Sequence, residues 1–310
     1  MRALDSRLDG SGLPHPPYLV LAVTLLVGQA CAGSPHSTPR QGFGTPPPSW
    51  MRGVWTRDWI EVSGVRSSGF AVHYLQTPSL FADVRVPIQR PSFSQATSFA
   101  DLSDADLLLL AGQRGFTGHV TAVDDTITWH HEIDFQPPDG TSDVGRVERL
   151  GPTQMYEHAL DSSYVESWRS LSSGDDTFLA LRLERGSRLD QMLVVVGDYF
   201  IYVRNRSEDL PVASSLDSLI RATHATRQQV IAYLDCEFST GRVHGGRLPW
   251  EIQASTLPWR EGRALGFVRT VTVLPDSVHV NVQVSGGERW SVPVNTLSKA
   301  DLVALFPGPR

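Results

Sequence analysis

Short stretches of alternating apolar and polar residues, separated by turn residues, fill most of the chain after residue 52. The first three are Gly53–Val62, Phe70–Gln76 and Leu80–Pro87, and they are rich in Val, Tyr, Trp and Phe. Such alternation between Gly, Ser, Pro and Asp turns is typical of antiparallel strands. The pattern recurs at 118–123, 126–135, 143–150, 154–158, 164–170, 178–184 and 192–204. A series of short strands with regular turns indicates a barrel or a sandwich.

Two stretches have the period of a helix instead. Ser103 and Asp106 form a capping pair at the start of a helix predicted over Ser103–Gln113. An apolar stripe from Leu216 to Leu234 predicts a second helix over Ser215–Phe238. The segment 266–310 returns to strands and ends in a capped helix signature. The sequence therefore predicts an all-β fold with two flanking helices and a small C-terminal β extension.

The first 31 residues have the pattern of a secretory signal peptide. Arg2 and Arg7 precede an apolar run over residues 18–27, and the small-residue exit Gly28-Gln29-Ala30-Cys31 follows. The run is well short of the ~20 residues that a membrane-spanning helix needs. We therefore expect export of the chain.

Two processing routes fit the exit of this signal. Ala30-Cys31-Ala32 suits ordinary signal peptidase, whereas Gly28–Cys31 resembles a bacterial lipobox in which Cys31 is lipidated. The Pro/Gly/Ser-rich segment 32–50 favours lipidation, because a disordered tether would hold a folded domain away from a bilayer. The expected location is the outer membrane or cell envelope, with a periplasmic or secreted protein as the alternative.

Composition narrows the possible partners. The formal net charge is −6, and no basic stripe or arginine-rich helix is present, so nucleic-acid binding is not expected. The two cysteines, Cys31 and Cys236, cannot build a disulfide framework or a cysteine metal site. Neither a glycine-rich phosphate loop nor a G-x-S-x-G nucleophile motif occurs. We expect no cofactor and no metal.

Three motifs together resemble a known family. They are Tyr74–Pro87, Trp129–Pro138 and Ser255–Gly262. They are similar to motifs of the Hri-type family, which comprises fungal proteins named for interaction with a casein kinase and their uncharacterised bacterial relatives. The resemblance covers roughly residues 53–265 and implies a lipocalin-like antiparallel β-barrel, placed here over residues 51–265. The resemblance implies no agreed chemistry. Because this chain has a predicted export signal, kinase interaction inside a cell is not carried over to it.

The candidate site residues come from the first two of these motifs. Alternation in a strand places His130, Glu132 and Asp134 on one face, opposite a mostly apolar face that includes His131. Adjacent histidines point to opposite faces, so His130 and His131 cannot bind one metal ion together.

On the preceding motif, Asp83 and Arg85 share a face. This pair either forms a structural salt bridge or orients a ligand carboxylate through the arginine. The predicted ligand-binding set is therefore Gln76, Arg85, His130, Glu132 and Asp134, with no catalytic residue assigned.

These observations predict an exported, membrane-tethered protein that binds a small amphipathic ligand or a protein partner of the envelope. The alternative is an unusual hydrolase or isomerase that acts on a small lipid-like substrate through the His130 face and Arg85. The distinguishing feature is the interior of the barrel. A ligand-binding barrel encloses ~300 Å³ or more, whereas a filled interior leaves a surface interaction.

Overall fold

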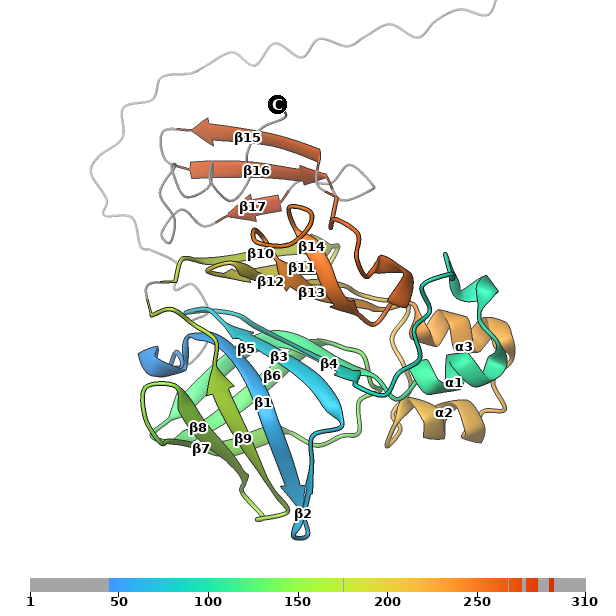
Figure 1. Cartoon of the computed structure of the whole chain (residues 1–310), viewed down its shortest axis with the longest axis horizontal. Helices are drawn as coiled ribbons and strands as arrows, with labels where there is room; N and C mark the ends of the chain where they lie inside the picture. The colour runs from blue at the N-terminus through green and yellow to red at the C-terminus, as the bar shows by residue number, and fades with distance from the viewer. Residues whose placement is uncertain (1–44, 175, 267, 275–276, 284–289, 293–310) are drawn as a thin grey trace, which may run out of the picture. The chain divides into compact units, whose positions relative to one another are not determined.

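The computed structural model describes residues 45–174, 176–266, 268–274, 277–283 and 290–292. Its first part is a closed antiparallel barrel (Figure 1). β9 pairs back onto β1 from Trp55↔Ser170 to Val62↔Tyr164, which closes the sheet, and β2 (Val65–Ser67) extends the end of β1. An all-β, lipocalin-like barrel is therefore confirmed. Its strands are β1 (Gly53–Val62), β3 (Phe70–Gln76), β4 (Phe81–Pro87), β5 (Arg114–Val123), β6 (Thr126–Asp134), β7 (Asp143–Arg149), β8 (Gln154–Ala159) and β9 (Tyr164–Ser170).

The strands after residue 177 form a second antiparallel sheet. The pairing of β1 with β9 leaves no edge for β10, so the barrel ends at residue 170 and not at residue 265 as predicted. The second sheet contains β10 (Phe178–Arg185), β11 (Arg188–Val196), β12 (Tyr199–Arg204), β13 (Glu237–Arg242) and β14 (Glu251–Ser255). The C-terminal strands β15 (Val268–Leu274), β16 (Ser277–Gln283) and β17 (Trp290–Val292) join it through β10. The predicted terminal helix lies outside the described residues.

Three helices lie beside the two sheets. α1 (Asp104–Leu110) has the predicted Ser103–Asp106 capping box. In place of one helix over Ser215–Phe238, the chain forms α2 (Leu216–Ala222) and α3 (Arg227–Leu234). The break follows from local chemistry, because the Thr226 side chain accepts a hydrogen bond from the Gln229 backbone and starts a new helix. None of the described helices is long and apolar enough to cross a membrane.

The predicted signal peptide and Cys31 lie outside the described residues, as does most of the predicted tether. The tether was expected to be disordered up to residue 50. Instead, the Thr45 carbonyl accepts a hydrogen bond from Ala122 N at 3.0 Å, and the 3-10 helix η1 spans Ser49–Met51. The ordered part of the chain therefore begins before the first strand.

Alternation along the barrel strands produces two separate apolar layers. The outward-facing set, such as Val54, Ala82 and Val84, packs against Met192 and Val194 of the second sheet and against the helices. The inward-facing set forms a second cluster inside the barrel: Trp55, Val72, Tyr74, Phe81, Val120, Ile127, Trp129, Met155 and Trp168. Each fully buried large side chain contributes roughly 1.5–3 kcal/mol to stability. Because the outer layer is used for packing, the barrel interior, or lumen, is the place to look for a site.

Candidate functional site in the barrel lumen

One half of the lumen is closed by apolar side chains. Met51 of η1 is fully buried at this end. The Trp55 indole N–H donates to the Met51 carbonyl at 2.8 Å, which attaches η1 to β1. Aliphatic side chains from β5 to β8 complete the packing: Val120, Ile127, Val147 and Met155. This half is packed core and offers no room for a ligand.

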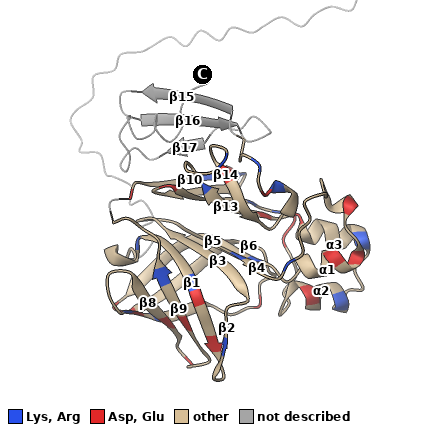
Figure 2. Cartoon of the chain, in the orientation of Figure 1, with Lys and Arg blue, Asp and Glu red and all other residues tan. Residues whose placement is uncertain are grey.

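The other half of the lumen contains charged side chains. Acidic and basic residues both occur along the barrel strands (Figure 2). Arg57 on β1 forms an ion pair with Glu166 on β9, and their side chains are only 6% and 3% exposed. Arg85 on β4 donates to Asp83 at 2.8 Å and lies 3.5 Å from Glu166. Burial raises the pKa of the Asp83 carboxyl, and the Arg85 charge opposes that change. Two arginines and two acids thus form one buried network.

His131 joins β6 to β7 at the rim of this polar half. Its Nδ1 lies 2.8 Å from Asp134 and its Nε2 3.0 Å from Asp143, while the ring stacks on Phe116 at 4.3 Å. Burial by itself would lower the pKa of His131, but the hydrogen bonds to both carboxylates and their charges raise it to about 9. His131 is therefore protonated at neutral pH. Because both ring nitrogens are bonded, it has no nitrogen for proton transfer to a substrate.

Glu157 on β8 is an acid of the lumen that forms no ion pair with a described residue. Its Oε1 accepts a hydrogen bond from the Tyr164 hydroxyl at 2.9 Å, and the residue is 8% exposed. Burial and then the charge of Glu166 raise the pKa of Glu157 well above its usual range. The Glu157 carboxyl therefore favours a proton or a nearby cation.

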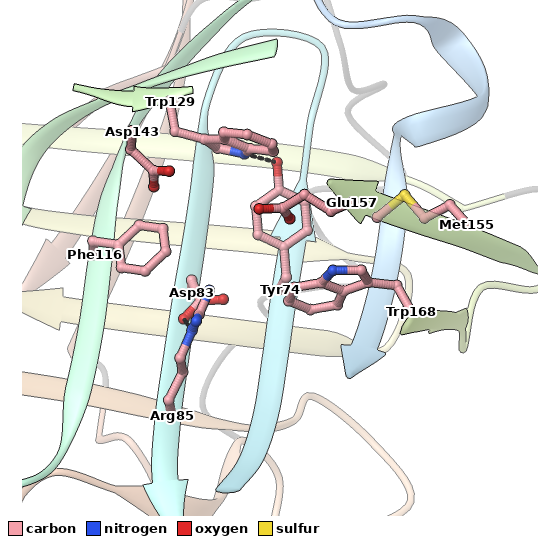
Figure 3. A pocket seen from close by; sticks show the side chains of 9 residues that line it. All are labelled: Tyr74, Asp83, Arg85, Phe116, Trp129, Asp143, Met155, Glu157 and Trp168. Atoms are coloured by element: carbon pink, nitrogen blue, oxygen red, sulfur yellow. Dashed lines mark hydrogen bonds and ion pairs between the residues drawn. The ribbon is translucent and has the colours of Figure 1, made fainter. Parts of the chain in front are cut away.

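A small cavity lies between these groups (Figure 3). Its volume is about 20 Å³. One water molecule needs roughly 10–15 Å³ by this measure, so the cavity holds a group of about that size. This is far below the ~300 Å³ expected of a ligand-filled barrel. The lining residues are Tyr74, Asp83, Arg85, Phe116, Trp129, Asp143, Met155, Glu157 and Trp168.

Three buried polar atoms in the lumen have no hydrogen-bond partner among the described residues. They are Asp83 Oδ2, Glu166 Oε2 and Trp168 Nε1, and Asp83 and Trp168 line the cavity. Buried polar groups are nearly always paired, and leaving one unpaired costs roughly 1–3 kcal/mol. These atoms are therefore the part of the barrel that is best suited to receive a polar group.

The structure brings three of the five predicted site residues to the lumen. Arg85 lines the cavity, and Asp134 lies at the rim against His131. Gln76 is fully buried and accepts a hydrogen bond from the Tyr74 hydroxyl, which itself accepts one from the Trp129 indole at 3.1 Å. Gln76 thus positions Tyr74 and does not line the cavity.

His130 and Glu132 lie on the outer face of the barrel. The His130 ring stacks on His119 at 4.5 Å, and Glu132 forms two hydrogen bonds with Arg182 of β10, at 2.9 and 2.5 Å. The predicted single face of His130, Glu132 and Asp134 is therefore wrong.

The cause is a β-bulge between β5 and β6. Thr117 pairs with Ile133 and Gly118 with His131, so Glu132 is an extra residue. Glu132 and Ile133 both face outward, and Asp134 turns inward.

Sequence reasoning missed several residues of the site, among them Glu157 and Glu166. A signal for both was present. Glu157 lies two residues from Met155 on β8, and Glu166 lies two residues from Trp168 on β9. An acid at an alternate position of an otherwise apolar face indicates a buried charge when the face belongs to a closed barrel.

The arrangement is suited to binding more than to the predicted acid–base alternative. Arg85 lies inside the barrel and His130 outside it, so the two cannot act on one substrate. Within the described ranges, no group of three or more His, Cys, Asp or Glu residues is arranged to hold a metal ion. Cys236 is fully buried, and burial raises the pKa of its thiol, which makes it a poor nucleophile.

Comparisons with known proteins add nothing to this assignment. No protein-family model, curated protein or solved structure matches the chain. The resemblance to the Hri-type family stays a prediction from its three motifs. The geometry of the lumen is therefore the basis for a functional assignment.

Proposed function

We propose that this protein is a non-enzymatic binding protein that takes the polar end of a small amphipathic ligand into the polar half of its barrel. The observation that carries the proposal is the pair of unpartnered buried atoms beside the cavity, Asp83 Oδ2 and Trp168 Nε1. A buried ionic network rarely repays its desolvation cost through stability alone. A ligand group that hydrogen-bonds to these atoms accounts for the presence of the buried ionic network.

The volume of the cavity determines which part of the ligand enters. A space of about 20 Å³ accepts a polar head of a few atoms, so the apolar tail must lie outside. Val62, Val65 and Leu160 are 47%, 70% and 61% exposed at the tips of two hairpins. Val62 pairs with Tyr164, whose hydroxyl contacts Glu157, so these tips lie at the polar end of the barrel. They provide an apolar surface for the tail.

Two charged residues of the cavity wall reach solvent: the Asp143 side chain is 31% exposed and that of Arg85 is 15% exposed, whereas the adjacent Asp83 side chain is fully buried. Arginine has a long and flexible stem, so Arg85 widens this opening when its contacts with Asp83 and Glu166 break. This supports entry of the ligand head from the polar end.

The proposal includes export and lipid attachment at Cys31, supported by the charged start, the apolar run 18–27 and the segment 32–50. Replacement of Cys31 by serine is expected to move the protein from the membrane fraction to the soluble fraction. Unchanged fractionation of C31S would refute lipid attachment and favour cleavage after Ala32.

The test of ligand binding uses three eight-carbon amphiphiles with different heads: octylamine, octanol and octanoate. Thermal unfolding and native mass spectrometry are measured with each. At least one amphiphile is expected to raise the Tm by several degrees, because a ligand that binds only the folded state stabilises it. Asp83→Asn is expected to lose this shift, and Trp168→Phe, which removes the indole N–H and keeps an aromatic ring, is expected to lose it for a head that accepts a hydrogen bond.

Glu148→Gln is the matched control, because Glu148 lies on the outer face of β7 with its side chain 50% exposed. Glu148→Gln is expected to bind the amphiphiles as the unmodified protein does. If no amphiphile binds, or if W168F and D83N bind as tightly as E148Q, the lumen proposal is refuted. The small cavity favours one other candidate in that case, a protein partner bound on the barrel surface.

A further inference from the structure

The polar half of the lumen and its rim contain more acids than cations. The acids are Asp83, Asp134, Asp143, Glu157 and Glu166, and the paired cations are Arg57, Arg85 and His131. Each of these cations is already in contact with one or two of the acids. Arg114 lies exposed at the mouth and reduces the excess without removing it. Within the described part of the chain, the lumen therefore has uncompensated negative charge.

Among the described acids of the lumen, Glu157 is the one without a paired cation. Its hydrogen bond comes from the neutral Tyr164 hydroxyl, and among the described residues it has no arginine or histidine within ion-pair distance. The unpartnered atoms of the lumen also indicate a shortage of hydrogen-bond donors, since they comprise two carboxylate oxygens and a single donor, the Trp168 indole. The lumen is short of donors and of positive charge. Burial raises the pKa of Glu157, which is the expected response of an acid without a cation.

The arginine of the cavity is not free to receive an anion. Arg85 Nε donates to Asp83 at 2.8 Å, and its Nη1 lies 3.5 Å from Glu166. A ligand carboxylate would have to break these contacts and would meet Glu157 at close range. Like charges in a buried site are strongly unfavourable, which excludes an anionic head.

The walls of the cavity are aromatic. Tyr74, Phe116, Trp129 and Trp168 line the cavity together with Glu157 (Figure 3). Aromatic faces attract cations, and the combination of an acid with aromatic rings is typical of sites for organic ammonium groups. The volume of about 20 Å³ matches one water-sized group and therefore an –NH₃⁺ end, which is close to water in size. A trimethylammonium head is too large for this space.

We infer that the ligand's polar end is a primary ammonium group, bound by Glu157 within the aromatic walls of the cavity. The inference rests on the proposed function and adds the chemical class of the ligand. Asp83 Oδ2 accepts a further hydrogen bond from the same group, and the apolar tail leaves past Arg85. An ammonium group accepts no hydrogen bond, so Trp168 contributes the face of its ring and not its indole N–H.

The experiment compares octylamine with octanol, octanoate and octyltrimethylammonium by thermal unfolding at neutral pH. Octylamine is expected to give the largest rise in Tm, whereas octanoate and octyltrimethylammonium are expected to give none. Glu157→Gln should abolish the octylamine shift while its circular dichroism spectrum stays unchanged, and Glu148→Gln should retain it.

A pH series provides a second measurement that does not depend on the folding of E157Q. Protonation of Glu157 competes with the ammonium group, so the octylamine shift should shrink as the pH falls through the raised pKa of Glu157. The response to octanol, which carries no charge, should not follow this trend.

The outcomes distinguish the ammonium inference from the proposed function. If octanol or octanoate binds through Asp83 and Trp168 and octylamine does not, the ammonium inference is overturned and the proposed function stands. If no amphiphile binds, both fail. Octylamine binding that survives in E157Q and is independent of pH would overturn the role of Glu157. Binding of octyltrimethylammonium as tightly as octylamine would overturn the size argument.

Discussion

Replacement of His131 by glutamine tests the charged rim of the lumen. His131 lies between two acids on β6 and β7, with hydrogen bonds of 2.8 and 3.0 Å, and its ring stacks on Phe116. Glutamine is polar and of similar size, but it carries no charge at any pH. The substitution therefore removes the cation and leaves Asp134 and Asp143 to repel each other. Its effect on stability should depend strongly on pH.

The magnitude follows from the pKa of His131. Contacts with the two acids raise that pKa to about 9 in the folded protein, from about 6.5 for an ordinary imidazole. A group with a higher pKa in the folded state stabilises the fold fully below its unfolded pKa, and loses this contribution as the pH rises through its folded pKa. The difference corresponds to about 3 kcal/mol as an upper bound, and solvent screening at the exposed rim reduces it to roughly 1–2 kcal/mol, present at pH 6 and lost by pH 10. Loss of the ring contact with Phe116 adds about 1 kcal/mol at every pH.

Urea unfolding at pH 6, 8 and 10 measures this dependence. H131Q is expected to lower the free energy of unfolding by roughly 2–3 kcal/mol at pH 6 and by about 1 kcal/mol at pH 10. Val123→Ala is the control, since Val123 is 72% exposed on the adjoining hairpin, and its effect should be equal at all three pH values. An NMR titration should give His131 a pKa near 9. An equal loss at pH 6 and pH 10, or a titration near pH 6.5, would show that the two acids do not stabilise a charged His131.

Two further predictions concern the bulge and the buried thiol. Gly118→Ala should destabilise the fold by roughly 3 kcal/mol or more, because the new Cβ would lie 1.9 Å from the His130 carbonyl oxygen. Gly151→Ala, where nothing lies within 4 Å of the new Cβ, should change the Tm little, and equal Tm values for the two variants would contradict this account. Cys236 is fully buried with a raised pKa, so a thiol reagent should label it only at the rate of unfolding. Rapid labelling of the native protein would show that the thiol is accessible.

The strands were predictable because their signals are local. Alternation and turn residues gave β1, β3 and β9 with the bounds that the structure has. The end of the barrel was not predictable in the same way, because it depends on pairing between β1 and β9, which are more than one hundred residues apart. A strand that closes a barrel and a strand that continues a sheet have the same pattern. The split of the second helix shows a similar limit, since the Thr226 cap interrupts an apolar stripe that continues across it.

The candidate site was predictable where alternation is unbroken. Asp83 and Arg85 were expected on one face of their strand, and they form an ion pair inside the lumen. Arg57 and Glu166 were missed although they follow the same rule, because their strands contain no motif that drew attention to them. Their roles become visible only when closure brings β1 and β9 together. Charged residues on the inner face of a closed barrel are therefore better guides to this site than the adjacent histidines.

The bulge at Gly118 links the failed prediction to the construction of the site. Regular alternation would place His131 and Asp134 on opposite faces of β6, since they are three residues apart. The extra residue, Glu132, brings both to the lumen, where they form the hydrogen bond of 2.8 Å that defines the rim. Glu132 keeps the outward direction that alternation from His130 gives it, and its contact with Arg182 connects the barrel to the second sheet. Bulges are common beside functional sites because they redirect side chains in this way. Gly118 is required at this position, since any side chain would collide with the His130 carbonyl. One glycine thus permits the bulge that brings His131 and Asp134 together at the rim of the lumen.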